Sequence, residues 1–189
     1  LLGTIDYCTA EMSTSSGLGM KPGYWRTDTR EAPAGAMTGI GVHIVDAIID
    51  LVGEIDEVMC LNARRSAPYA DDTTAVLLKC RNGVLATFTG CFSTVPGYRF
   101  AVAGSGGTGE VSGHFLDRLV ITPMPEGKYG TAATRNETTD TPGYNMLGAA
   151  LDAFADAVTA KQPFLIPAAE IRHGVAVLEA IVKSASSGQ

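Results

Sequence analysis

Hydrophobic residues recur at helical spacing between residues 37 and 52. The positions that fill one broad apolar arc are Ile40, Ile44, Val45, Ile48, Ile49 and Val52. Three polar residues fall outside this arc on a single stripe: His43, Asp46 and Asp50. Gly53 follows at the position where a helix ends in a left-handed cap. The pattern therefore predicts an amphipathic helix over residues 37–52 whose polar stripe carries a histidine.

Segments rich in β-branched and aromatic residues, separated by turn residues, predict a series of strands. They cover residues 2–12, 55–63, 73–80, 84–93, 98–103, 109–115 and 118–122. Asn82-Gly83 predicts a tight hairpin between two of them. Residues 123–142, which are rich in Gly, Pro and Thr, are expected to form a loop.

Two more helices are predicted near the end of the chain. Apolar residues keep helical spacing at Leu147, Leu151, Phe154 and Val158, and again at Ile171, Val175, Leu178 and Val182. The order of elements indicates an α+β fold, an open, mainly antiparallel β-sheet with helices on one face. The other face is left for a partner. We expect self-association through an apolar sheet face drawn from Val76, Leu78, Val84, Ala86 and Phe88.

Composition narrows the class of protein without naming a function. The chain has 189 residues, of which 46% are hydrophobic and 18% charged, as expected for one soluble globular domain. A net charge of −6 argues against a nucleic-acid partner, and no apolar run approaches the roughly 20 residues that cross a membrane. The four cysteines, Cys8, Cys60, Cys80 and Cys91, lack metal-ligand spacing and are expected to be buried, reduced thiols, which favours a cytoplasmic location.

His43 is the strongest candidate for chemistry. An imidazole has an unperturbed pKa near ~6.5, so it can exchange a proton with a substrate hydroxyl as a general acid or base. The alternative is a structural histidine that hydrogen-bonds Asp46 or Asp50. His114 and His173 have no companions at ligand spacing, so no metal site is expected.

Arg26, beside Trp25, is the next candidate. Its guanidinium could hold a hydroxyl, carboxylate or phosphate in fork geometry, while the indole packs against a sugar or nicotinamide face. Alternatively, Arg26 stacks on Trp25 and anchors a surface loop. Tyr98 and Tyr144 could also reach a substrate cleft from loops.

Residues 104–109 match G-x-G-x-x-G in letters, but a strand-like segment follows them instead of the helix that a dinucleotide site needs. We therefore expect no cofactor-binding residues in this chain.

Several motifs together resemble the Gfo/Idh/MocA family of NAD(P)-dependent oxidoreductases. They are Trp25-Arg26, the run from Ala36 to Asp46, and residues 72–76, 82–88, 102–111 and 177–185. Their order and spacing match only the C-terminal, dihydrodipicolinate-reductase-like domain of that family. The resemblance implies a single substrate-binding and oligomerisation domain over residues 1–189, a fragment of a longer two-domain enzyme.

The resemblance also implies what the rest of that enzyme does. A Rossmann domain with a Gly-rich loop and a catalytic Lys, absent from these residues, would hold NAD or NADP, and the fragment alone would bind no cofactor and be inactive. The substrate would be a sugar, polyol or related hydroxy compound. His43 would be catalytic, and Arg26, Trp25, Asp46, Tyr98 and Tyr144 would contact the substrate. The assembly would be a homodimer or tetramer.

Gly39 departs from the family pattern, in which dehydrogenases often place an Asp one helical turn before the His. His43 would then work with the Lys of the absent domain, with Asp46 or with water, and Gly39→Asp would be expected to keep or raise dehydrogenase activity. Two alternatives stay open: a catalytically silent binding or assembly module, and a lyase or isomerase that uses bound NAD transiently.

Overall fold

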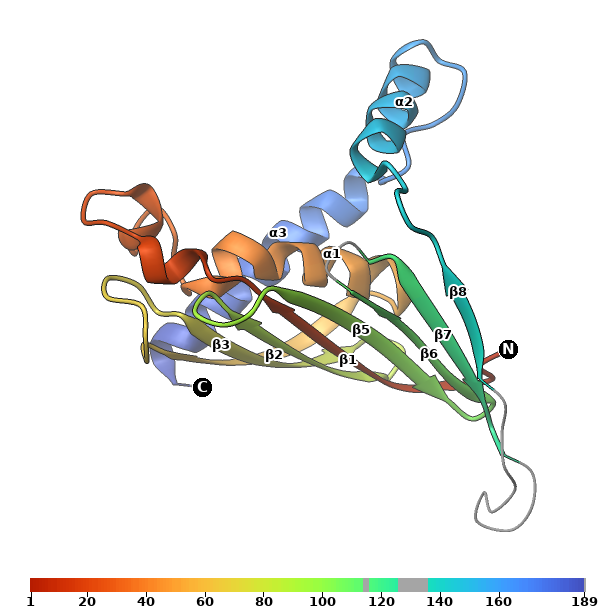
Figure 1. The fold of residues 1–189 in the computed structure, drawn as a ribbon, viewed down its shortest axis with the longest axis horizontal. Helices are drawn as coiled ribbons and strands as arrows, with labels where there is room; N and C mark the ends of the chain where they lie inside the picture. Colours follow the sequence, from red (N-terminus) through yellow and green to blue (C-terminus); the bar gives the residue numbers. More distant parts are fainter. Residues whose placement is uncertain (114–115, 126–135, 189) are drawn as a thin grey trace.

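The chain forms one open β-sheet with helices on one side. The computed structural model describes residues 1–113, 116–125 and 136–188. Within these residues the sheet has eight strands in the order β2-β3-β4-β1-β5-β6-β7-β8, and only the β1/β4 pair is parallel (Figure 1). The strands are β1 (Ile5–Ser13), β2 (Ile55–Ala63), β3 (Thr73–Cys80), β4 (Leu85–Cys91), β5 (Gly97–Gly104), β6 (Gly107–Ser112), β7 (Arg118–Pro123) and β8 (Glu137–Asp140).

The helical elements lie on one side of this sheet (Figure 1). They are η1 (Ser16–Gly19), η2 (Trp25–Thr27), η3 (Met37–Gly41), α1 (Val42–Leu51), α2 (Met146–Val158) and α3 (Ala168–Ser187). α1 and α3 pack against each other and over the sheet, whereas α2 stands off from this layer. The predicted α+β fold with an open, mainly antiparallel sheet is confirmed.

The core lies between the sheet and the α1 and α3 helices. α1 buries Ile44, Val45, Ile48 and Ile49, while His43, Asp46 and Asp50 stay exposed, as the periodicity predicts. The core residues contributed by the sheet and α3 include Cys8, Ala10, Val76, Leu78, Phe88, Val177 and Ile181. Because the apolar arc is buried, the polar stripe of α1 faces away from the core.

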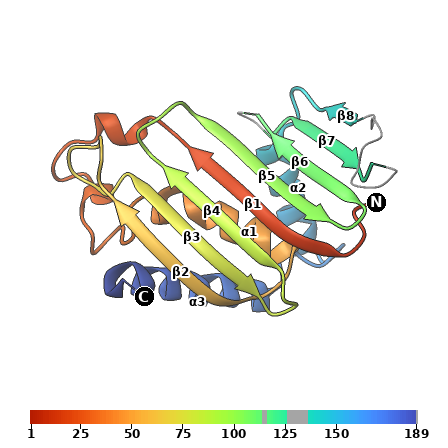
Figure 2. The same cartoon turned by 90° about the horizontal axis from the view of Figure 1, so that it is seen from below.

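The predicted apolar partner face is wrong. Val76, Leu78, Val84, Ala86 and Phe88 lie beneath the helices and are at most 6% exposed. Side chains alternate between the two faces of a strand, so the opposite set forms the open face. Figure 2 shows this face with no helix over it, and its exposed large apolar residues are Tyr7, Met59, Leu61, Leu77 and Leu85.

Two local predictions also need correction. The first turn of the predicted 37–52 helix is a π-helical turn over Met37–Gly41, in which the Val42 N–H donates to the Met37 carbonyl. The predicted loop over residues 123–142 contains β8, whose four residues are all polar and exposed. β8 lies at the edge of the sheet and pairs with β7 through its backbone. Because it buries no side chain, its sequence lacks the alternation of hydrophobic and polar residues that predicts a strand.

The Asn82-Gly83 hairpin is confirmed. Gly83 has a φ of 91°, a conformation that favours glycine, and its N–H donates to the Cys80 carbonyl over 2.9 Å. The Asn82 amide also donates to the Val52 carbonyl over 2.8 Å. The hairpin is therefore tied to the end of α1.

The four cysteines are unpaired: Cys8, Cys60 and Cys80 are buried, and Cys91 is half-buried. Burial, and secondarily the neighbouring Cys80, raises the pKa of the Cys8 thiol to about 12. Among the described residues, no helix has the length and apolar character needed to span a membrane.

Asp72 anchors the loop between β2 and β3. Its buried carboxylate accepts hydrogen bonds from the backbone N–H groups of Arg65, Ser66 and Ala67, at 3.0, 2.6 and 2.6 Å, and from the Thr73 hydroxyl. Burial alone would raise the pKa of Asp72, but these hydrogen bonds outweigh it and lower the pKa to about 2.

We expect Asp72→Asn to lower the free energy of unfolding by roughly 2 kcal/mol at neutral pH, because the depressed pKa reports stronger binding of the ionised form in the folded state. This contribution is present above the unfolded pKa, near 4, and is lost as the pH falls towards 2. Urea unfolding between pH 2 and 7 measures it. Asp6→Asn, at an exposed position, should leave the profile unchanged. Equal acid profiles for Asp72→Asn and the wild type would contradict this assignment.

Candidate functional site

His43 opens onto a cavity at one end of the sheet. This His43 cavity has a volume of about 440 Å³ and is formed where the end of β1, the start of β5 and the polar stripe of α1 meet. Its lining residues are Met12, Ser13, Thr14, His43, Asp46, Ala47, Gly97, Tyr98, Leu116 and Met146. The fold therefore brings together three of the predicted site residues, His43, Asp46 and Tyr98.

The His43 imidazole is available for a ligand. It is exposed, and within the described part of the chain no side chain hydrogen-bonds to it, neither Asp46 nor Asp50. Tyr98 lies in β5 and not in a loop, and its ring is half-buried. Burial, and secondarily Cys8, raises the pKa of Tyr98 above its usual value, so its hydroxyl stays protonated and can donate a hydrogen bond.

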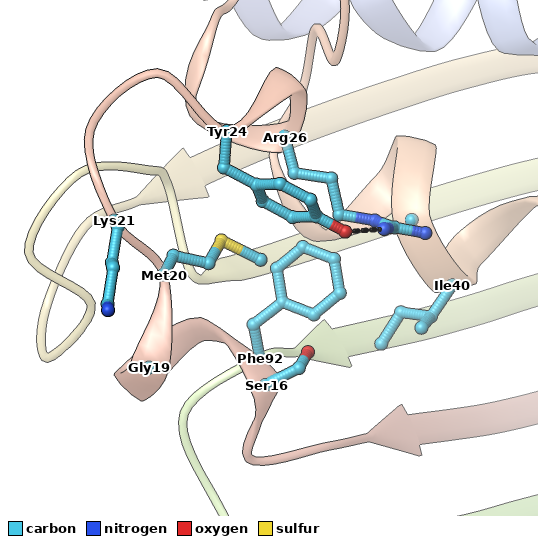
Figure 3. Close-up of a pocket in the computed structure, with 9 residues that line it drawn as sticks. Ser16, Gly19, Met20, Lys21, Tyr24, Arg26, Ile40 and Phe92 are labelled. Atoms are coloured by element: carbon cyan, nitrogen blue, oxygen red, sulfur yellow. Dashed lines mark hydrogen bonds between the residues drawn. The ribbon is translucent and has the colours of Figure 1, made fainter.

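A second cavity lies beside the loop that carries Arg26. This Arg26 cavity has a volume of about 480 Å³ and is shown in Figure 3. It is lined by Ser16, Gly19, Met20, Lys21, Tyr24, Arg26, Gly39, Ile40 and Phe92. The two cavities have no lining residue in common, but their linings are close in the chain: Gly39 lies one helical turn before His43, and Ser16 lies two residues after Thr14.

Arg26 is held by its two aromatic neighbours. The guanidinium lies 4.2 Å from the centre of the Trp25 ring and donates from Nη1 to the Tyr24 hydroxyl, the hydrogen bond drawn in Figure 3. The stacking of Arg26 on Trp25, which the sequence analysis gave as an alternative, is therefore present in the structure. In this arrangement Arg26 lines the cavity.

Phe92 occupies the place next to Gly39. A Cβ added at Gly39 would lie 2.2 Å from Cζ of the Phe92 ring, a distance that no real contact shows. Phe92 is 3% exposed, its N–H donates to the Asp72 carbonyl, and its carbonyl accepts from the Gly17 N–H. Its backbone is therefore fixed. The expectation that Gly39→Asp alone would be tolerated does not fit this contact.

The remaining predicted site residues, Trp25 and Tyr144, line neither the His43 cavity nor the Arg26 cavity. Trp25 lines a different, shallow hollow with Thr27 and Asp28. Tyr144 precedes α2 and is 67% exposed to solvent. His43 and Asp46 also border a smaller hollow of about 200 Å³ to which Glu170 of α3 contributes.

Sequence reasoning missed Tyr24, Lys21, Phe92 and Glu170. Tyr24 had a signal, because it directly precedes Trp25-Arg26. Phe92 and Glu170 come next to the site only through tertiary packing, and no local pattern marks them.

Residues 104–109 form the hairpin turn between β5 and β6, in which Gly104 pairs with Gly107. A strand follows, with no helix N-terminus to receive a pyrophosphate, so this segment does not fit a dinucleotide. Among the described residues no group of three or more His, Cys, Asp or Glu side chains could hold a metal ion. His173 accepts a hydrogen bond from the Ile55 N–H over 3.0 Å, a structural role, whereas His114 lies outside the described residues.

Comparison with known proteins connects this geometry to one family. The family model for the GFO/IDH/MocA C-terminal domain matches residues 1–110. No curated protein sequence matches the chain.

Solved structures share the fold over the whole chain. A protein from Desulfitobacterium hafniense, assigned as an NADPH-dependent oxidoreductase, superposes with a TM-score of 0.86 at 21% identity over 100% of this chain and 56% of its own. UDP-N-acetylglucosamine 3-dehydrogenase from Acidithiobacillus ferrooxidans superposes with a TM-score of 0.78 at 19% identity, over 98% of this chain and 56% of its own. Levoglucosan dehydrogenase in complex with NADH superposes with a TM-score of 0.81 at 17% identity, over 98% of this chain and 57% of its own. The chain thus spans a little over half the length of these proteins.

Proposed function

The chain belongs to the GFO/IDH/MocA C-terminal domain family, and from this premise we propose that it is the substrate-binding domain of an NAD(P)-dependent oxidoreductase. The substrate would be a sugar, polyol or related hydroxy compound. The observation that carries this proposal is the exposed His43 imidazole, which borders a cavity of about 440 Å³ together with Tyr98 and Asp46.

His43 is the proton carrier in this proposal. When a substrate hydroxyl is oxidised, its proton passes to the imidazole and the carbon loses a hydride; reduction of the carbonyl runs in reverse. The nicotinamide, when bound, supplies or accepts that hydride. Tyr98 would hydrogen-bond the same oxygen or its neighbour, since burial keeps its phenol protonated. Asp46, exposed on the same stripe, would orient the substrate or the imidazole.

We place the dinucleotide on a second domain. The relatives are longer than this chain, and α2 offers a surface suited to such a domain. Leu147, Leu151, Phe154 and Val158 form one apolar stripe along α2 and are 56–71% exposed. Exposed apolar stripes of this kind are typical of interfaces. A Rossmann domain packed against α2 would cover these side chains. In the full-length protein, this nucleotide-binding domain would come first and residues 1–189 would follow it.

The test uses the full-length protein. We expect reduced nicotinamide to form when NAD⁺ or NADP⁺ is supplied together with a suitable hydroxy compound from a panel of sugars and polyols, and not with either alone. A full-length protein that binds the dinucleotide but turns over no member of the panel would favour the alternative, a catalytically silent binding or assembly module. Gly39 is the observation behind that alternative, because Phe92 leaves no room for a carboxylate beside His43.

The open sheet face supports the proposed self-association. Met59 pairs with Leu77 across β2 and β3, and Tyr7 pairs with Leu85 across β1 and β4. These side chains are 45–53% exposed. An exposed apolar sheet face is a liability unless another surface covers it. A second copy of the chain would cover it in a homodimer, and two such dimers would form a tetramer.

We expect light scattering to give a dimer or a larger closed assembly, and Leu77→Lys to shift it to the monomer, since the substitution puts a charge at the centre of the face. Val95→Lys, at a loop position that is 78% exposed, is the matched control and should leave the mass unchanged. A monomer mass for the wild type at every concentration would count against this interface. The cytoplasmic location is part of the same proposal and rests on the four unpaired thiols.

A further inference from the structure

The guanidinium of Arg26 has no acidic partner. The ion pairs of the described residues join Arg30 to Asp28, Lys79 to Glu57, Arg81 to Glu54, Arg99 to Glu110 and Lys161 to Asp156. None of them includes Arg26 or Lys21. Arg26 and Lys21 therefore pair with no carboxylate of the described residues, and both line the same cavity, where they can attract an anion.

Arg26 is oriented before any ligand arrives. Trp25 supports one face of the guanidinium at 4.2 Å and the Tyr24 hydroxyl takes one of its five N–H donors. The side chain is half-buried. Because the aromatic neighbours already fix its position, a ligand would not have to immobilise it, and the remaining donors suit the two oxygens of a carboxylate or phosphate.

The rest of the cavity lining agrees with an anion. Lys21 adds a second cation at the opposite end from Ile40 (Figure 3), Ser16 adds a hydroxyl, and no Asp or Glu contributes to the lining. Phe92 and Met20 provide an apolar floor. The result is a cavity of about 480 Å³ with positive polar groups on an apolar base.

Gly39 connects this cavity to the chemistry. Gly39 and Arg26 line the same cavity, so a carboxylate at position 39 could neutralise Arg26, but the Phe92 ring occupies the space that a side chain at position 39 would need. Glycine therefore leaves Arg26 without a carboxylate at position 39, which lies one helical turn before His43.

We propose that the Arg26 cavity binds an anionic substituent, a carboxylate or a phosphate, on the sugar-like substrate whose hydroxyl His43 serves. The inference rests on the proposed function for the position of the reacting hydroxyl, but the binding of the anion does not depend on turnover. Arg26 is the anchor, and Lys21 contributes long-range attraction from the rim.

The experiment is a titration of three probes, D-glucuronate, D-glucose 6-phosphate and D-glucose, into the full-length protein and into the 189-residue chain, followed by NMR. At least one charged probe should bind about tenfold or more tightly than D-glucose, the increment expected for a charge-assisted bidentate contact. Which charged probe binds more tightly distinguishes a carboxylate site from a phosphate site.

Arg26→Gln should reduce the affinity for the charged probe to that for D-glucose. Arg30→Gln is the matched control, since Arg30 belongs to the same loop but pairs with Asp28 and lies outside the cavity lining. The double variant Gly39→Asp/Phe92→Ala should also abolish the preference while keeping Arg26, because it supplies an internal carboxylate.

The proposal is overturned if D-glucose binds as tightly as both charged probes, if Arg26→Gln leaves the preference intact, or if none of the probes binds either protein. His43→Ala should retain the preference for the charged probe. A preserved preference in a protein that transfers no hydride would therefore reject the proposed oxidoreductase activity alone, and turnover of neutral sugars without any charge preference would reject the anion site alone.

Discussion

Replacing His43 by Ala is expected to lower kcat of the full-length enzyme by about 10²–10⁴-fold, the usual contribution of a positioned general acid or base. The imidazole borders the cavity with Tyr98 and Asp46, and no other histidine among the described residues lines it. Affinity for the dinucleotide should hardly change, because His43 is proposed to act on the substrate hydroxyl and does not lie in the G-x-G-x-x-G segment, which itself leads into a strand.

Steady-state kinetics with saturating cofactor measure this effect, and thermal unfolding provides the check on folding. His43 is exposed and makes no hydrogen bond to another side chain of the described residues, so the melting temperature should stay the same. Asp50→Ala, on the same stripe but outside the cavity lining, should keep the wild-type kcat. Equal kcat values for His43→Ala and the wild type would leave His43 as a surface residue.

Gly39→Asp is expected to destabilise the fold by about 1–3 kcal/mol or more, the range for overpacking a filled site. The new Cβ would lie 2.2 Å from Cζ of Phe92 and 2.9 Å from Cε1. To make room, the ring would have to turn about its side-chain torsions out of its buried position, because the Phe92 backbone is hydrogen-bonded to Asp72 on one side and to Gly17 on the other.

A double-mutant cycle tests this clash directly. Phe92→Ala alone should cost about 3–5 kcal/mol of unfolding free energy, as a buried aromatic truncation does. In Phe92→Ala the pocket is open, so adding Gly39→Asp should cost much less than it does in the wild type, and the two penalties should not add. Additive free energies from chemical unfolding would show that Phe92 is not what excludes a side chain at position 39.

The sequence predicts most of the fold because hydrophobic residues recur regularly, with the period of a helix or of a strand. The arc from Ile40 to Val52 and the alternation in β3 and β4 define α1 and the central strands almost residue by residue. The alternation does not say which set of side chains the helices cover, so Val76 and Leu78 were placed on the open face when they belong to the core. Both sets contain apolar residues, and only packing decides between them.

The candidate site is predicted in part. His43 and Asp46 follow from the helical stripe, and Arg26 from its position beside an aromatic residue. No local pattern in the sequence marks the π-helical turn at Met37–Gly41, in which the Val42 N–H donates to the Met37 carbonyl. The contact of Phe92 with Gly39 joins segments far apart in the chain. Such contacts come from tertiary structure, and the spacing of residues cannot show them.

The most direct test of the account is to follow the hydride itself. The full-length protein is incubated with NAD⁺ or NADP⁺ and a sugar substrate that carries deuterium on the carbon to be oxidised. The nicotinamide is then examined by NMR. We expect deuterium at C4 of the reduced nicotinamide with the wild type, and a rate of transfer lowered by about 10²–10⁴-fold with His43→Ala. Substrate conversion with no deuterium on the nicotinamide, or transfer that does not depend on His43, would contradict it.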